Sequence, residues 1–153
     1  MKTRTVIVAL LAALALCSSA LAQGRGFGLG IIAGEPTGIS AKFWTGAKTG
    51  IDMAAAWSVE GENAFNFHAD YLIHDFGVFK VTKGRMALYY GIGGRLVDTD
   101  ADAFVGVRVP VGINYLFATS PLDLFVEVVP VLNLSPDTDL DFDGGLGVRF
   151  WFR

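Results

Sequence analysis

Apolar residues recur at every second position through most of residues 23–153. A period of two is typical of β-strands, whose side chains alternate between the two faces of a sheet. Clusters of Gly, Pro, Asp, Asn or Ser close each alternating segment, and no segment after residue 23 has the period of a long helix. The pattern predicts an all-β fold of eight strands, at residues 27–34, 38–46, 50–58, 63–74, 85–96, 103–117, 122–134 and 143–152.

The sixth of these segments shows the two faces most clearly. Valines occupy the odd positions from Val105 to Val111, while Arg108 and several glycines occupy the even ones. In the seventh segment, Pro130 cannot donate a hydrogen bond to a neighbouring strand. We therefore expect a bulge or a local break at that position.

Alternation alone does not say which face lies inside, because a soluble ligand-carrying barrel also alternates. Here 52% of the residues are hydrophobic and only 18% are charged, with 19 glycines. The less apolar face carries about one charge per strand among Gly and Ala, which would cover a water-facing exterior poorly. The same residues suit the narrow interior of an eight-stranded barrel. The sequence therefore predicts an antiparallel up-and-down transmembrane β-barrel whose apolar face meets lipid and whose closure pairs every backbone group.

Charged residues on the inward face are expected to pair with one another, because an unpaired buried charge is costly. Such a network would plug the lumen and oppose a conducting channel. The predicted lumen network comprises Lys42, Asp52, His68, Asp70, Arg85, Arg95, Arg108, Glu127 and Arg149, with His74 beside them.

Residues 1–22 have the pattern of a cleaved secretory signal peptide. A basic start precedes an unbroken apolar run from Val6 to Leu16, which is shorter than the roughly 20 residues that a membrane-spanning helix needs. A small-residue motif ends at Ala22 and predicts cleavage there. Cleavage of this signal would leave one domain, residues 23–153. We expect this domain in the bacterial outer membrane.

The single cysteine, Cys17, lies within the predicted signal peptide. Leu16 stands where a lipoprotein signal has Gly, Ala or Ser, so lipidation is not expected. Disulfide and thiolate chemistry is therefore excluded from the mature domain. The chain has 12 basic and 15 acidic residues, and this negative balance argues against nucleic-acid binding.

Charged residues also divide between the two sets of predicted turns. In an even-stranded barrel that starts at the periplasm, the turns after the odd-numbered strands lie outside the cell. These outer turns contain Glu35, Glu60, Glu62, Asp98, Asp100, Asp102, Asp137, Asp139 and Asp141, whereas the inner turns contain Lys48, Lys80 and Lys83. Aromatic residues are placed as the interfacial girdles of a membrane barrel require, with Phe27, Phe43, Tyr115, Phe117 and Phe152 at the inner ends and Trp57 and Phe65 at the outer ends.

Two patterns suggest a metal site, and each also has a purely structural interpretation. His68, Asp70 and His74 share a strand face beside Asp52 and could ligate zinc or form an acid–base pair. With two histidines in the chain, we favour a hydrogen-bonded lumen network. The acidic outer turns could gather divalent cations and bridge them to lipopolysaccharide, but they lack the Gly and distal Glu of an EF-hand, so we favour solvated loops. The candidate cation ligands are Asp98, Asp100, Asp102, Asp137, Asp139 and Asp141.

Nothing in the sequence specifies a reaction. Ser40 and Ser58 are the candidate strand nucleophiles, but no G-x-S-x-G elbow or adjacent histidine motif accompanies them. The glycine-rich runs lack the spacing of phosphate-binding loops. We therefore expect no catalytic residues, no cofactor and no bound metal.

The C-terminal stretch Gly147-Val-Arg-Phe150-Trp-Phe152-Arg153 is similar to the signal by which the barrel assembly machinery recognises outer-membrane barrels, although the family pattern usually ends on the aromatic residue itself. The stretches 88–95, 106–115 and 143–149 resemble those of uncharacterised small outer-membrane barrel proteins of the OmpA/OmpX-like eight-stranded type. The resemblance spans essentially the whole mature chain. It implies the fold and the assembly signal at Gly147, Phe150 and Phe152, and it implies no activity.

We expect an integral outer-membrane protein with a structural or surface-interaction role. Its expected partners are outer-membrane lipid, lipopolysaccharide and, during biogenesis, the barrel assembly machinery, and we expect a monomer. Three alternatives remain open: a lipid-active outer-membrane enzyme, a narrow pore, and a soluble periplasmic barrel that binds a hydrophobic ligand.

Overall fold

The computed structural model describes residues 26–35, 37–58 and 64–152, and all regular structure in these ranges is β-strand. Among these residues, no helix is long and apolar enough to cross a membrane. The predicted signal peptide with its cleavage point at Ala22, and the turn residues Glu60 and Glu62, lie outside the described residues. The strands are β1 (Phe27–Glu35), β2 (Gly38–Trp44), β3 (Thr49–Ser58), β4 (Ala64–Asp75), β5 (Arg85–Thr99), β6 (Ala103–Arg108), β7 (Val111–Leu116), β8 (Leu122–Ser135) and β9 (Asp139–Phe152).

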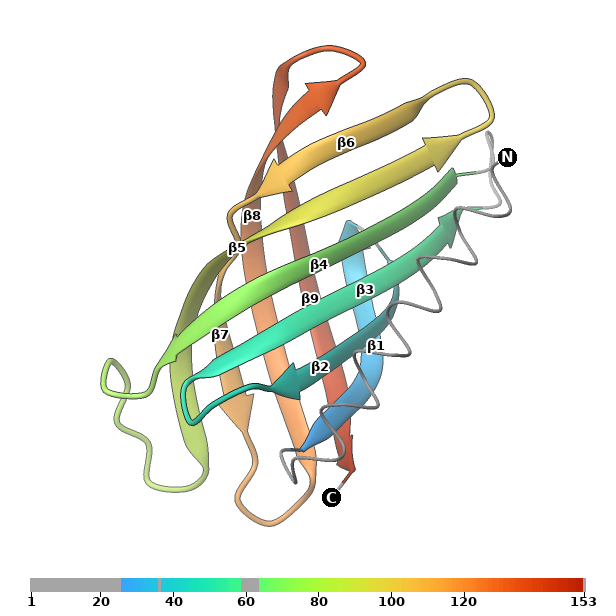
Figure 1. Cartoon of the computed structure of the whole chain (residues 1–153). Helices are drawn as coiled ribbons and strands as arrows, with labels where there is room; N and C mark the ends of the chain where they lie inside the picture. Colours follow the sequence, from blue (N-terminus) through green and yellow to red (C-terminus); the bar gives the residue numbers. More distant parts are fainter. Residues whose placement is uncertain (1–25, 36, 59–63, 153) are drawn as a thin grey trace.

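The strands form a closed antiparallel ring (Figure 1). Strands β1 to β5 pair in chain order, β8 pairs with β9, and β9 closes the ring by pairing with β1. Strands β6 and β7 share one position in the ring, because both pair with β5 on one side and with β8 on the other. The predicted eight-stranded antiparallel barrel is confirmed, with one of its eight strands divided in two.

The division occurs at Val109–Pro110, so the prediction of one continuous strand over 103–117 is wrong. The local break expected at Pro130 is found in the pairing of β8 with β6 and β7, which is interrupted between Val131 and Val128. Strand β6 ends at Arg108 and β7 begins at Val111, because Pro110 has no N–H with which to continue a ladder. Strand β8 runs through Pro130 without interruption. The Pro130 carbonyl accepts a hydrogen bond from the Val109 N–H at 3.0 Å, so the missing donor of Pro130 faces the gap between β6 and β7.

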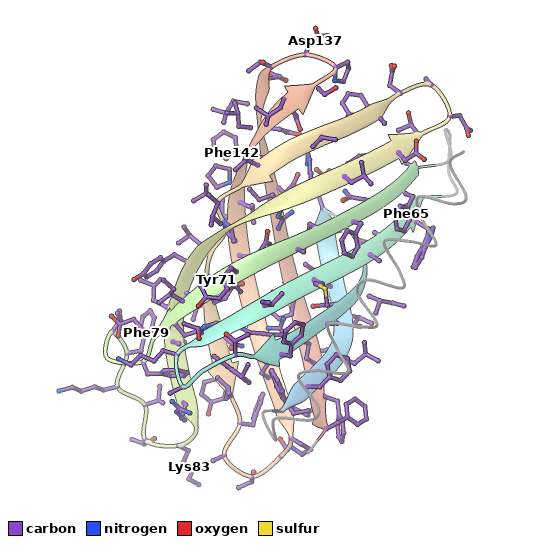
Figure 2. All side chains as sticks on the ribbon, viewed as in Figure 1. Phe65, Tyr71, Phe79, Lys83, Asp137 and Phe142 are labelled. Atoms are coloured by element: carbon purple, nitrogen blue, oxygen red, sulfur yellow. The ribbon has the colours of Figure 1, made fainter. Side chains whose placement is uncertain are left out.

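The barrel has two ends, which are distinguished here by the strand ends and connections that lie at each. Phe27 pairs with Phe152, so the first and last strands meet at one end, called here the terminal end; the opposite end is the distal end. Figure 2 shows Lys83 at the terminal end and Asp137 at the distal end. The connections 45–48, 76–84 and 117–121 lie at the terminal end, and 100–102 and 136–138 lie at the distal end.

Side-chain exposure separates the two faces of the barrel wall. Val105, Val109 and Val111 are 45–46% exposed, whereas Arg108 is fully buried at 0%. The valine row therefore points outward and the arginine points inward. Large apolar side chains are exposed on strands all around the ring, among them Ile31, Ile39, Trp57, Tyr71, Ile92, Val111, Val128 and Leu146.

The last strand is longer than the sequence pattern suggested, because β9 begins at Asp139 and not at residue 143. Asp139 pairs with Asn133 of β8, and Leu140 and Phe142 continue the outward apolar row, each about 60% exposed. Glu35 and Asp98 were also expected in outer turns, but they lie in β1 and β5. The assignment of Asp139 and Asp141 to an outer turn is wrong as well. Both belong to the extended β8–β9 hairpin, whose tip carries Asp137 (Figure 2).

Candidate functional site

An apolar cluster that includes Ile32, Leu72 and Phe125 lies inside the barrel, and charged and polar side chains occupy much of the remaining interior. The charged and polar side chains come from the inward positions of β2 to β9, so the period of two in each strand places them there. Most of the predicted lumen residues are among them. The buried polar set is Ser40, Lys42, Asp52, His68, Asp70, His74, Arg95, Arg108, Asn114, Asp123, Glu127, Asn133, Asp143 and Arg149.

Arg149 of β9 is the cationic centre of one ion-pair cluster. Its Nη1 lies 2.6 Å from Asp52 Oδ2 and its Nε lies 3.1 Å from Asp123 Oδ1. The guanidinium also stacks on Phe125, 4.0 Å from the ring centroid. Two carboxylates and an aromatic face thus compensate the charge of one fully buried arginine. Ser40, a candidate nucleophile, faces this cluster with its Oγ 3.4 Å from Arg149 Nη1.

Arg108 of β6 is the centre of a second cluster with three carboxylates around it. Its Nε donates to both oxygens of Asp70 at 3.1 and 3.2 Å. Its Nη1 donates to Asp143 Oδ2 at 3.3 Å, and its Nη2 lies 3.5 Å from Glu127 Oε1. Glu127 in turn accepts a hydrogen bond of 2.8 Å from the Tyr89 hydroxyl. This arrangement ties β4, β5, β6, β8 and β9 together across the lumen.

Arg95 of β5 is the centre of the third cluster, toward the distal end. Its Nη1 donates to both oxygens of Asp143 at 2.8 Å. Its Nη2 donates to Asn133 Oδ1 at 2.9 Å and to Asp141 Oδ2 at 3.0 Å. Because Asp143 also accepts from Arg108, the second and third clusters form one continuous network.

Lys42 and His74 occupy the lumen near the terminal end. The Nδ1 of His74 lies 3.2 Å from the carbonyl oxygen of Lys48, which can only accept, so Nδ1 carries the proton. His74 Nε2 then accepts from Lys42 Nζ, 2.6 Å away. Aromatic rings pack beside this pair. The ring centroid of Trp44 lies 4.5 Å from that of His74 and 6.0 Å from that of Trp151.

Arg85 does not belong to the lumen network, so this part of the prediction is wrong. Its side chain is exposed, and its guanidinium lies 3.9 Å from the ring centroid of Phe76. Arg85 has the inward parity of β5 but is the first residue of that strand. It therefore sits where the barrel opens to solvent, and parity alone could not distinguish that position from the packed centre.

A pocket of about 680 Å³ opens at the distal end of the barrel. Arg95 and Asp143 contribute to its lining, together with Glu35, Asn66 and Phe104. The Arg95 cluster borders this pocket, and the ion-paired clusters of Arg108 and Arg149 occupy the lumen on its terminal side. The described interior thus combines a recess at the distal end with paired charges on its terminal side.

The histidines and acidic residues considered as metal ligands do not converge. His68 Nε2 lies 3.8 Å from Asp70, while His74 is bonded to Lys42. Of the candidate cation ligands, Asp141 accepts from Arg95. Asp98 lies in β5, Asp100 and Asp102 follow it, Asp137 lies at the hairpin tip and Asp139 lies in β9. Within the part of the chain that the structure describes, no group of three or more His, Cys, Asp or Glu residues is placed to hold a metal ion.

The residues of the C-terminal motif occupy both faces of β9. Gly147 points inward, where an added Cβ would lie 2.5 Å from the Ile31 carbonyl oxygen of β1 and 2.3 Å from Phe125 Cζ of β8, so the close approach of the β1 backbone requires glycine there. Phe150 and Phe152 point outward, 45% and 48% exposed, with ring centroids 5.1 Å apart. The motif therefore combines a tightly packed inner position with an aromatic outer edge.

Several lumen residues were missed by sequence reasoning, namely Tyr89, Asp123, Asn133 and Asp143. Asp123 and Asn133 share the parity of Glu127 in β8, and Tyr89 shares the parity of Arg95 in β5. Applying one parity along the whole strand would have found these three. Asp143 has the parity of Arg149 and is the first residue of the predicted strand 143–152, so the same rule would have found it as well.

Comparison with known proteins identifies a similar fold. The N-terminal β-barrel domain of Pseudomonas aeruginosa OprF matches this chain with a TM-score of 0.54 and 14% sequence identity. The match covers 84% of this chain and 96% of that domain. No family model matches the chain, and a comparison with curated proteins finds no match. At this identity the likeness concerns the fold alone, a small antiparallel β-barrel.

Proposed function

We propose that this protein is an integral outer-membrane β-barrel with a structural or surface-interaction role, a lumen plugged by ion pairs, and no catalytic activity. The observation that carries the proposal is the inverted distribution of side chains. Arg108 and Arg149 are fully buried, whereas Val128 and Leu146 are each 59% exposed. In water this arrangement would expose a continuous apolar surface, while in a bilayer it places the apolar face against acyl chains.

The even number of strands favours one orientation of the barrel in the membrane. The terminal end would face the periplasm, because exported barrels with an even number of strands begin and end on that side. The distal end, with Asp137 at its tip, would face the outside. Aromatic pairs lie near both ends, with ring centroids 6.2 Å apart for Phe27 and Phe152 and 5.6 Å apart for Trp57 and Phe65, as interfacial girdles would.

The OprF barrel domain has a similar fold, and this likeness supports the proposal that the chain is a small barrel of the outer membrane. Outer-membrane lipid and lipopolysaccharide would then be the principal partners of the outward face. The C-terminal motif of Gly147, Phe150 and Phe152 would be read by the barrel assembly machinery, after export directed by residues 1–22. A closed ring leaves no free edge between its strands, and we expect a monomer.

Envelope fractionation tests this proposal. We expect the full chain, produced in a bacterium with two membranes, to remain with the outer membrane during carbonate extraction. On SDS gels it should migrate compactly before boiling and more slowly afterwards, because a closed barrel resists detergent until heated. Release into the aqueous fraction by carbonate, or identical migration with and without boiling, would contradict the proposal.

A further inference from the structure

The connection between β4 and β5, residues 76–84, is the longest at the terminal end. It presents apolar and basic side chains side by side. Val78 and Val81 are 50% and 39% exposed, and Lys80 and Lys83 are also exposed. Figure 2 shows Phe79 at the flank of the barrel and Lys83 at its terminal end.

Specific contacts hold this loop at the level of an aromatic pair on the barrel wall. The Tyr115 hydroxyl donates to the carbonyl oxygen of Lys83 at 3.0 Å, and the Tyr115 ring packs edge-to-face on Phe117 with centroids 4.9 Å apart. Gly84 completes the turn with a φ of 73°, where an added Cβ would lie 2.5 Å from the Leu116 carbonyl oxygen. The backbone of Lys83 is therefore held beside an aromatic pair of the kind that lies at the membrane interface of β-barrels.

The terminal end as a whole is basic. Lys48, Lys80, Lys83 and Arg85 are exposed there, and Asp75 is the one exposed acidic residue among the described residues of that end. The distal end has the opposite charge. A partner of the terminal end should therefore be anionic, and a partner of the 76–84 loop should also accept valine side chains.

We propose that the 76–84 loop binds anionic phospholipid headgroups. The ammonium groups of Lys80 and Lys83 would contact the phosphates, while Val78 and Val81 lie at the boundary between headgroups and acyl chains. Cationic and apolar side chains combined at an interface are the general signature of lipid-surface binding. A soluble anion would explain the lysines but not the exposed valines. The inference rests on the proposed membrane function and adds the lipid class that meets the terminal end.

Lipid selectivity tests the inference. The purified barrel is equilibrated in mixed micelles with phosphatidylglycerol and phosphatidylcholine, and native mass spectrometry gives the ratio of their association constants. We expect a clear preference for phosphatidylglycerol. The preference should fall about 5-fold for each lysine in K80Q and K83Q, and it should survive in K80R/K83R. The V78S/V81S variant should lower retention of both lipids.

The controls separate this inference from the membrane proposal. D137N at the distal end should leave the ratio unchanged, and heat-modifiable migration of each variant shows that the barrel is folded. A folded barrel that inserts into vesicles but binds both lipids equally would overturn the lipid inference alone. The inference would also be overturned if soluble glycerophosphate displaced bound phosphatidylglycerol as effectively as added phosphatidylglycerol does. Failure to enter any vesicle would overturn the membrane proposal instead.

Discussion

Replacing Arg108 with leucine should lower the free energy of unfolding by about 3–5 kcal/mol, because it removes one partner of a buried ion-pair cluster. Arg108 is 0% exposed and is the cation that Asp70, Glu127 and Asp143 share. Without it, Asp70 loses the only arginine that contacts it in the described network. Urea unfolding in lipid vesicles, followed by the fraction of compact protein on unheated gels, measures the change.

Two further variants identify the cause of this loss. V107A removes side-chain volume from the outward face of the same strand and should cost much less. R108L/D70N removes the Asp70 carboxylate together with the arginine that neutralises it. The free energy of unfolding should therefore fall by less than the sum of the decreases in the two single variants. A loss below about 1 kcal/mol for R108L, or strict additivity with D70N, would argue that the lumen charges are hydrated individually and not paired.

Placing an arginine on the outward face should be nearly as damaging, but only in a bilayer. Val128 lies near the middle of β8 and is 59% exposed. In lipid, V128R should lower the free energy of unfolding by about 2–4 kcal/mol, the cost of an arginine near the bilayer midplane of a β-barrel. Urea titration in vesicles measures this effect.

The matched control is T119R, in the exposed 117–121 turn at the terminal end. It adds the same side chain away from the barrel wall and should change stability by less than about 0.5 kcal/mol. If V128R were as neutral as T119R in vesicles, the outward face would not lie in hydrocarbon.

The ring of strands could be predicted because alternation is a local property of the chain. In β4, His68 and Asp70 face inward and Tyr71 faces outward, as their parity indicated. The long β9 was harder to predict, since three aspartates between residues 139 and 143 have the composition of a loop. Pairing with β8, at Asn133 and Asp139 among others, makes this segment a strand. That pairing is a tertiary effect that composition cannot reveal.

The interior could be predicted as a set of residues but not as a set of contacts. Parity placed Arg95, Arg108 and Arg149 inside, but it could not say that Asp143 joins the first two of them. Those contacts depend on how far each strand is shifted relative to its neighbours. The break at Pro110 illustrates the same limit: two prolines, Pro110 and Pro130, were visible in the sequence, but only the strand register shows that they meet at one gap.

The central claim is that the valine-rich face of the wall contacts lipid, and fluorescence quenching by brominated lipids tests it most directly. Residues 23–153 contain no cysteine, so a single cysteine at position 128 or 119 can carry a bimane label in vesicles. We expect strong quenching at position 128 by lipids brominated deep in the acyl chain, with little quenching by aqueous iodide, and the reverse at position 119. Strong iodide quenching at position 128 without bromolipid quenching would contradict the claim.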